Sequence, residues 1–141
     1  SQHSVSACVA MAPHVFVEDV SLRSITQARN AYADGGGNGL RTRLERYHDD
    51  VDNAFWQWND IWLNPAFRSF DIRQACPKIT APLLVIQGEN DEYGTLQQVT
   101  DILESVPQAR SLVLPDCGHS PHRDCPDTVI QALDKFLADC P

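Results

Sequence analysis

The sequence has 141 residues, of which 43% are hydrophobic and 21% are charged, so it can bury the core of one ordinary domain. The formal net charge is −8 without a run of Lys and Arg, which argues against nucleic acid and anionic membranes as partners. The apolar runs are too short to span a membrane, and no secretory signal peptide is visible at the start. We therefore expect a globular, cytoplasmic protein.

Residues 5–12 form a small-apolar run that predicts a strand buried on both faces, ended by Pro13. Residues 14–21 read as a loop, and Ser21 is a plausible cap for the helix that follows. The expected apolar face of that helix consists of Leu22, Ile25, Ala28 and Tyr32. The glycine-rich stretch 34–39 then predicts a loop or hinge. It is not a phosphate-binding loop, because no strand precedes it and no Lys-Ser/Thr follows.

Two helical patterns follow the glycines, and Asn64-Pro65 closes the second of them. The first pattern is Leu40, Leu44, Tyr47 and Val51, and the second is Phe55, Trp58, Ile61 and Trp62. Three tryptophans within seven residues indicate the packed interior of a helical subdomain. The sharper alternative is that Trp56 and Trp58 line an apolar substrate pocket.

The character of the sequence changes after Pro77. Residues 82–87 predict a buried strand, 96–106 an amphipathic helix, 111–114 a short strand and 115–118 a turn. Pro126 suits the first position of a last helix. The expected face of that helix is Val129, Ile130, Leu133, Phe136 and Leu137. Alternating apolar strands and helices predict parallel pairing and an α/β fold.

Each of the two predicted strands ends in a polar turn, and these turns present Asp91 and His119, 28 residues apart. A carboxylate and an imidazole from neighbouring strand ends are two of the three parts of a nucleophile–base–acid triad. The alternatives are an Asx-type turn for Asp91 and a surface-loop histidine for His119.

The segment 82–141 resembles the C-terminal end of an α/β-hydrolase, with GENDEYGT at the position of the triad acid and PDCGHSPH at that of the triad histidine. The resemblance implies that residues 1–20 are a strand and loop of the hydrolase core, 21–80 a helical cap, and 81–141 the C-terminal strand-helix-strand-helix. The expected fold is thus the C-terminal part of an α/β-hydrolase parallel sheet with an inserted cap. It also implies that His14 lies near the site entrance.

The family's nucleophile belongs to a G-x-S-x-G turn upstream of the cap, and no such pentapeptide occurs in these 141 residues. The nearest match, Gly118-His119-Ser120-Pro121-His122, has histidine where the tight turn needs a small residue. Ser120 is therefore a poor candidate for the nucleophile. We expect the cap and C-terminal portion of a longer hydrolase, inactive without its N-terminal half.

The resemblance implies a small, apolar, ester-like substrate, with epoxide, halide or carbon–carbon bond hydrolysis as further options. The alternative from another class is a non-catalytic ligand-binding or interaction module. The edge of strand 5–12 is expected to pair with the missing half of the sheet or to mediate self-association.

Five cysteines without C-x-x-C spacing favour reduced thiols in a cytoplasmic protein. Cys117 and Cys125 flank His119 and His122, so a zinc site has to be considered. The strand-to-helix turn expected there is poorly suited to a tetrahedral ligand set, and we predict neither a metal nor a cofactor.

Overall fold

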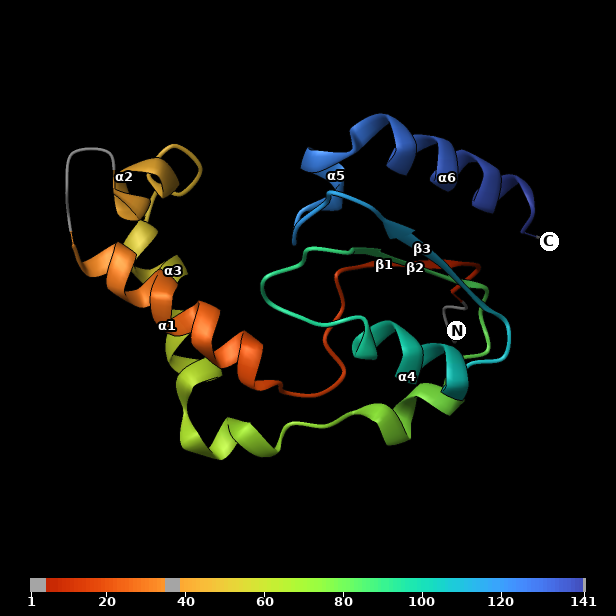
Figure 1. Ribbon diagram of the computed structural model, residues 1–141, viewed down its shortest axis with the longest axis horizontal. Coiled ribbons are helices and arrows are strands. Elements are labelled where there is room, and N and C mark those ends of the chain that lie inside the picture. Colours follow the sequence, from red (N-terminus) through yellow and green to blue (C-terminus); the bar gives the residue numbers. More distant parts are fainter. Residues whose placement is uncertain (1–4, 35–38, 141) are drawn as a thin grey trace. The chain divides into compact units, whose positions relative to one another are not determined.

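The computed structural model describes residues 5–34 and 39–140 (Figure 1). The chain divides into two compact units. Unit 1 is built from Ser1–Phe16 and Asp71–Pro141, and unit 2 is Val17–Phe70. The finer division expected from the sequence, at residues 20 and 80, stays a prediction.

Unit 1 contains a parallel three-stranded sheet with the order β1-β2-β3. The strands are β1 (Cys8–Met11), β2 (Leu83–Gly88) and β3 (Ala109–Leu114). All six residues of the central strand β2 are buried, as expected for a strand covered on both faces. The predicted α/β class with a parallel sheet is confirmed.

Helices cover both faces of this sheet, with α4 (Gln97–Ser105) on one side and α6 (Pro126–Ala138) on the other (Figure 1). The alternating side chains of β2 divide between the two faces. Leu83 and Val85 pack in the cluster that includes Val99, Ile102 and Val106 around α4. Leu84 and Ile86 pack with Val129 and Phe136 of α6. The 3-10 helix η2 (Arg73–Lys78) precedes β2, and the single turn α5 (Pro121–Asp124) precedes α6.

The last helix begins at Pro126, as the sequence predicts. Its apolar face is narrower than expected, because Ile130 and Leu137 are 55% and 57% exposed. Val129 and Phe136, seven residues apart, are the buried positions of this helix. The helix therefore presents a second apolar stripe to the surface of unit 1.

Unit 2 is helical, with α1 (Asp19–Ala33), α2 (Leu40–Leu44), α3 (Val51–Leu63) and the 3-10 helix η1 (Pro65–Ser69). Its core centres on Tyr32, Val51 and Phe55. The rings of Tyr32 and Phe55 stack with centroids 3.8 Å apart. Asn59 is fully buried and donates from Nδ2 to the Ile25 carbonyl at 3.1 Å, which ties α3 to α1.

Two predictions about these helices were wrong. Ser21 is not the cap of the first helix, because α1 begins two residues earlier at Asp19 and buries Ser21. The pattern from Leu40 to Val51 is not one helix either. Helix α2 ends at Leu44, and α3 begins at Val51, where the Asp50 carboxylate caps it by accepting from the Asn53 amide at 3.0 Å. Residues 35–38 of the predicted glycine-rich loop lie outside the described residues.

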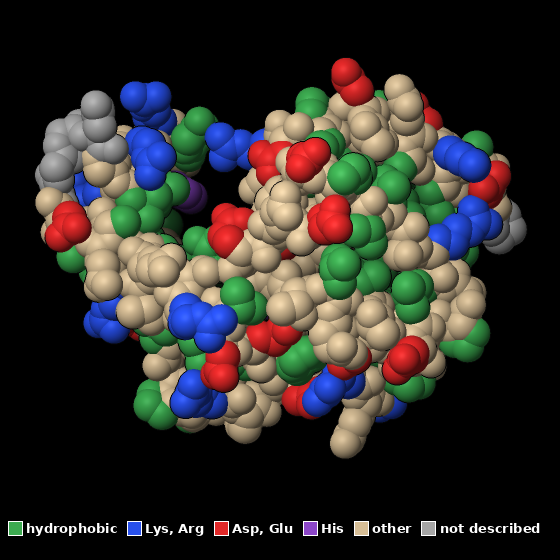
Figure 2. Space-filling model, in the orientation of Figure 1, with side chains coloured by type: hydrophobic (Ala, Val, Ile, Leu, Met, Phe, Trp, Pro, Cys, Tyr) green, Lys and Arg blue, Asp and Glu red, His purple; other side chains and the backbone are tan. Residues whose placement is uncertain are grey.

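Figure 2 shows acidic and basic side chains dispersed over the visible face rather than gathered by sign. Within residues 5–34 and 39–140, no helix has both the length and the apolar character needed to cross a bilayer.

Candidate active site

The candidate site lies at the carboxyl edge of the sheet in unit 1, where three loops begin. Asp91 follows β2, His119 follows β3 and His14 follows β1. The carboxyl ends of parallel strands share one edge, which is the usual location of sites in open α/β sheets. The structure brings these three predicted site residues together.

Asp91 and His119 form a direct hydrogen-bonded pair. Nδ1 of His119 lies 2.9 Å from each carboxylate oxygen of Asp91. The side chain of Asp91 is wholly buried, whereas that of His119 is 35% exposed. Because an ionised carboxylate can only accept, the proton of a neutral imidazole belongs on Nδ1, and the lone pair is then on Nε2. That is the tautomer in which a histidine can act as a base toward a nucleophile.

The Asp91 carboxylate is surrounded by donors from its own turn. Oδ1 accepts from the amides of Tyr93 at 2.8 Å and Gly94 at 3.3 Å, and Oδ2 accepts from Nε2 of Gln87 at 2.8 Å. Burial alone would raise the pKa of Asp91, but the hydrogen bonds from His119 and from the two amides hold that pKa below its ordinary value. The Asp91 carboxylate therefore both accepts the hydrogen bonds of an Asx-type turn and contacts His119, so the two interpretations of this residue are compatible.

Gly88 allows the two loops to approach each other. A Cβ at this position would lie 2.2 Å from the Cys117 carbonyl oxygen, so any side chain would collide with the backbone after β3. The loops are then joined by backbone hydrogen bonds, from the Glu89 amide to the Leu114 carbonyl at 2.8 Å and from the Asn90 amide to the Cys117 carbonyl at 2.9 Å. The adjacency of β2 and β3 and the absence of a side chain at Gly88 together place Asp91 next to His119.

Other side chains enclose the His119 ring. The Tyr93 ring lies with its centroid 4.7 Å away at a tilt of 48°, and the His14 ring lies at 5.8 Å. The His119 amide donates to Oε2 of Glu92 at 3.3 Å. Burial raises the pKa of the Tyr93 phenol, and the nearby Glu92 and Asp91 raise it further. Glu92, Tyr93 and Gln87 were not predicted as site residues from the sequence, although all three lie within four residues of Asp91.

Trp56 and Trp58 lie on α3 in unit 2. Trp56 packs edge-on against Tyr32 and Phe55, with the Arg29 guanidinium 5.6 Å from its ring centroid. Trp58 lies against Phe55 with ring centroids 5.6 Å apart and is 36% exposed. These contacts fit the predicted helical core, and a substrate-binding role for the two tryptophans stays a prediction.

The cysteines beside His119 belong to the core rather than to a ligand set. Cys117 is fully buried and packs, with Cys125 alongside, in the apolar cluster beneath α6. Burial, and then the hydrogen bond with Cys125, raise the pKa of the Cys117 thiol to about 11. In the part of the chain that the structure describes, no group of three or more His, Cys, Asp or Glu side chains is arranged to hold a metal ion.

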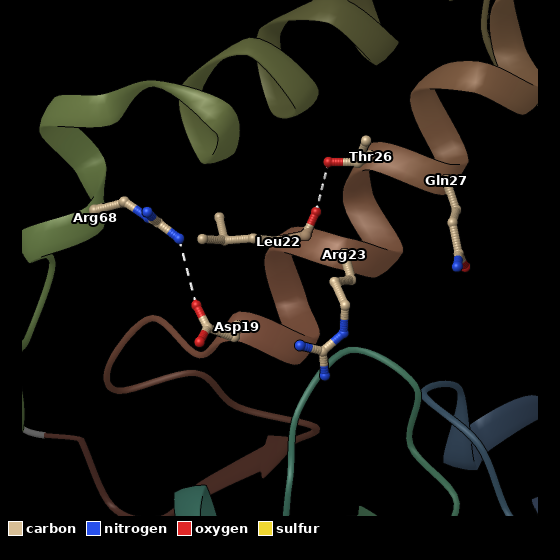
Figure 3. A pocket seen from close by; sticks show the side chains of 6 residues that line it. All are labelled: Asp19, Leu22, Arg23, Thr26, Gln27 and Arg68. Atoms are coloured by element: carbon tan, nitrogen blue, oxygen red, sulfur yellow. Dashed lines mark hydrogen bonds and ion pairs between the residues drawn. The ribbon is translucent and has the colours of Figure 1, made fainter.

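Unit 2 has a hollow of its own, about 360 Å³ in volume, beside α1 and η1 (Figure 3). Arg68 of η1 extends toward Asp19, with 3.3 Å between Nη2 and Oδ1. Arg23 and Gln27 extend toward the other side of α1. The polar groups therefore do not converge on one point, as they would in a binding site for a small polar ligand.

The sequence matches a known protein family and is similar to curated esterases. A family model described as the alpha/beta hydrolase family matches residues 2–132. The esterase YbfF of Escherichia coli K12 is 40% identical over 58 residues, which are 41% of this chain and 23% of that protein. A pimeloyl-[acyl-carrier protein] methyl ester esterase of Nitrosomonas europaea is 28% identical over 66 residues, which are 47% of this chain and 26% of that protein.

Solved structures resemble nearly the whole chain. A serine hydrolase involved in carbazole degradation, CarC, superimposes with a TM-score of 0.67 and 20% identity over 95% of this chain and 54% of its own. The meta-cleavage product hydrolase CumD of Pseudomonas fluorescens IP01 has a TM-score of 0.68 and 19% identity, with 95% and 56% covered. The chain thus spans little more than half of these hydrolases, and its matches span about a quarter of the curated esterases. With the family model matching almost end to end, the chain belongs to the alpha/beta hydrolase family.

Proposed function

We propose that this chain supplies the acid and the base of a nucleophile–histidine–aspartate hydrolase. The observation that supports this most directly is the 2.9 Å contact from Nδ1 of His119 to both oxygens of the buried Asp91 carboxylate. A structural ion pair at the surface would not need a carboxylate buried among so many donors. The arrangement leaves Nε2 as the nitrogen that meets the reacting groups.

In the proposed reaction, Nε2 of His119 removes the proton from the nucleophile as it attacks the substrate carbonyl. Asp91 stabilises the imidazolium and keeps its ring oriented. The imidazolium then returns the proton to the leaving alkoxide. A water molecule, deprotonated by the same nitrogen, releases the acid from the covalent intermediate.

The nucleophile and the oxyanion donors of this reaction come from outside the 141 residues. The proposal is supported by the lack of a G-x-S-x-G pentapeptide in the sequence and by the chain's coverage of only 54%, 57% and 56% of three solved hydrolases. Without a nucleophile and its oxyanion donors, the 141 residues alone are inactive as a hydrolase.

The proposed substrate is a small, apolar ester. The names of the curated relatives support the ester bond in this proposal, since they include esterases of Escherichia coli and Nitrosomonas europaea. Hydrolysis of epoxides, halides or carbon–carbon bonds remains a variant of the same proposal, and the residue that serves as nucleophile decides among them. A set of short-chain p-nitrophenyl esters is the natural first panel.

The test uses the full-length gene product that contains these residues. His119→Ala removes the base, and we expect turnover to fall by about four orders of magnitude. His122→Ala is the matched control, because His122 is exposed and three positions away. Near-normal turnover in His119→Ala, with an unchanged circular dichroism spectrum, would rule out the proposed role.

A non-catalytic ligand-binding module is the second candidate, and the missing pentapeptide is the observation that favours it. The two candidates differ in one result. A wild-type full-length protein that binds esters in calorimetry without hydrolysing them would support the binding module.

The free edge of β1 is the proposed site of pairing with another strand. β1 bonds to β2 on one side only within the described sheet, and Met11 at its end is 40% exposed. An unpaired edge of this kind recruits a strand from elsewhere. The partner is the remainder of the same hydrolase or, for the 141 residues alone, a second copy.

Analytical ultracentrifugation of the 141-residue chain tests this pairing. We expect concentration-dependent association that weakens when Val9→Pro removes a backbone donor from β1. A strictly monomeric profile at high concentration would contradict self-association.

A further inference from the structure

Gln87 is the side chain beneath the acid of the proposed triad. It is the penultimate residue of β2 and is 1% exposed. Its Nε2 donates to Oδ2 of Asp91 at 2.8 Å and to the Gly94 carbonyl at 3.0 Å. One amide group thus bonds the carboxylate and also a backbone carbonyl of the turn that carries it.

The orientation of this amide follows from the chemistry of its neighbours. Both contacts of Nε2 are to oxygen atoms that only accept hydrogen bonds. Turning the amide by 180° would direct Oε1 at the Asp91 carboxylate and the Gly94 carbonyl, so that acceptor would face acceptor. The donor is therefore the end that Gln87 presents to Asp91.

The rest of Gln87 is expensive to bury. Its Oε1 is buried and, among the residues that the structure describes, accepts no hydrogen bond. An unsatisfied buried acceptor costs stability, and the neighbouring strand positions are occupied by apolar residues. A polar side chain buried at this cost points to a requirement at Asp91 rather than at the core of the sheet.

We propose that Gln87 is a positioning residue, which holds the Asp91 carboxylate ionised and directed at Nδ1 of His119. The inference rests on the proposed acid–base role of that pair. Gln87 is 1% exposed and its amide donates to Asp91 and to the Gly94 carbonyl, so it acts on the pair through Asp91 and its turn. The loss of its donor would leave Oδ2 free to rotate away from the imidazole and would make protonation of the carboxylate easier.

Three variants of the full-length gene product test this role. Gln87→Met keeps the length of the side chain but has no donor. Gln87→Glu keeps a donor only while its carboxylic acid is protonated. Gln108→Met is the matched control, because Gln108 also donates from Nε2 to two carbonyls, those of Ile79 and Ala81, at the amino ends of the strands.

For Gln87→Met we expect kcat to fall about 10- to 100-fold while KM changes less than about threefold, as for the loss of one hydrogen bond to a charged group. In Gln87→Glu, burial beside Asp91 keeps the introduced acid protonated at low pH. Its kcat relative to wild type should therefore be highest at acidic pH and should decrease as pH rises.

A readout independent of turnover is the nuclear magnetic resonance signal of the His119 Nδ1 proton. We expect this signal to broaden or shift in Gln87→Met and to stay unchanged in Gln108→Met. If His119→Ala retains turnover but Gln87→Met still changes the signal, the proposed function fails and the positioning role stands. An unchanged signal in Gln87→Met would overturn the positioning role. If Gln87→Met does not fold, a pH-independent ratio for Gln87→Glu overturns it instead.

Discussion

Among the aspartates with lowered pKa values, Asp52 of unit 2 and Asp91 of unit 1 reach that state for different physical reasons. Asp52 of unit 2 has its pKa lowered to about 2 by hydrogen bonds from Arg41 and then Tyr32, and its side chain is 54% exposed. Asp91 of unit 1 has a wholly buried side chain and is held ionised by donors of its own turn and by His119. Asp52 forms a surface ion pair that connects helices of unit 2. Asp91 is a buried charge that is hydrogen-bonded to the neighbouring base, His119.

The hydrogen-bond partners of Asp52 indicate that it stabilises the fold of unit 2. Arg41 donates to it from Nε at 3.0 Å and from Nη2 at 2.9 Å, and the Tyr32 hydroxyl donates at 2.5 Å. Burial, followed by the Asp52 contact, raises the pKa of Tyr32 to about 12. Every donor here is used within the helical unit, so a strongly shifted pKa alone does not identify an active site.

The largest expected difference between Asp91 and Asp52 is the effect of substituting each of them on kcat. In the full-length gene product, we expect Asp91→Asn to lower kcat by about 10⁴, because an amide no longer enforces the Nδ1-protonated tautomer of His119. Asp52→Asn should leave kcat within about twofold. Steady-state kinetics on one ester substrate would measure both, and equal losses in the two variants would remove the distinction.

The pH dependence of stability is the next expected difference. The folded pKa of Asp91 lies below the unfolded value of about 4, so its contribution is present above that pH and is lost as pH falls through the folded pKa. The urea midpoints of wild type and Asp91→Asn should differ most at pH 5 to 7. They should converge as the pH falls below about 4 and through the lowered folded pKa of Asp91, and a difference that stays constant with pH would contradict the assignment.

Salt should produce the smallest effect, and only at Asp52. An exposed ion pair contributes little and is screened, with a Debye length of about 3 Å at 1 M salt. We expect Asp52→Asn to lower the thermal midpoint slightly in dilute buffer and to have no effect in about 1 M sodium chloride. The shift caused by Asp91→Asn should persist in both. Equal salt sensitivity would mean that the Asp91 pair is solvated as well.

The elements that could be predicted are those with a local pattern of apolar residues in the sequence. The apolar runs before Asp91 and His119 predicted β2 and β3, and the intervening amphipathic helix predicted their spacing and parallel pairing. Gln87 was not predicted, because it looks like a polar end to a buried strand until its Nε2 is seen to reach Asp91. The break between α2 and α3 was missed since the spacing of Leu44, Tyr47 and Val51 continues through the Asp50 cap.

The close approach at Gly88 has a consequence for engineering. The Cys117 carbonyl oxygen lies within 2.2 Å of where a Cβ of Gly88 would be, and the Glu89 and Asn90 amides donate to carbonyls of the neighbouring strand β3 and its turn. The loop that carries Asp91 and the loop that carries His119 are therefore packed and hydrogen-bonded to each other as one unit. Either loop exchanged alone between relatives would bring a mismatched surface against its partner. Grafts that move residues 88–94 together with 114–119 should preserve the pair, so this double loop is the natural unit of recombination.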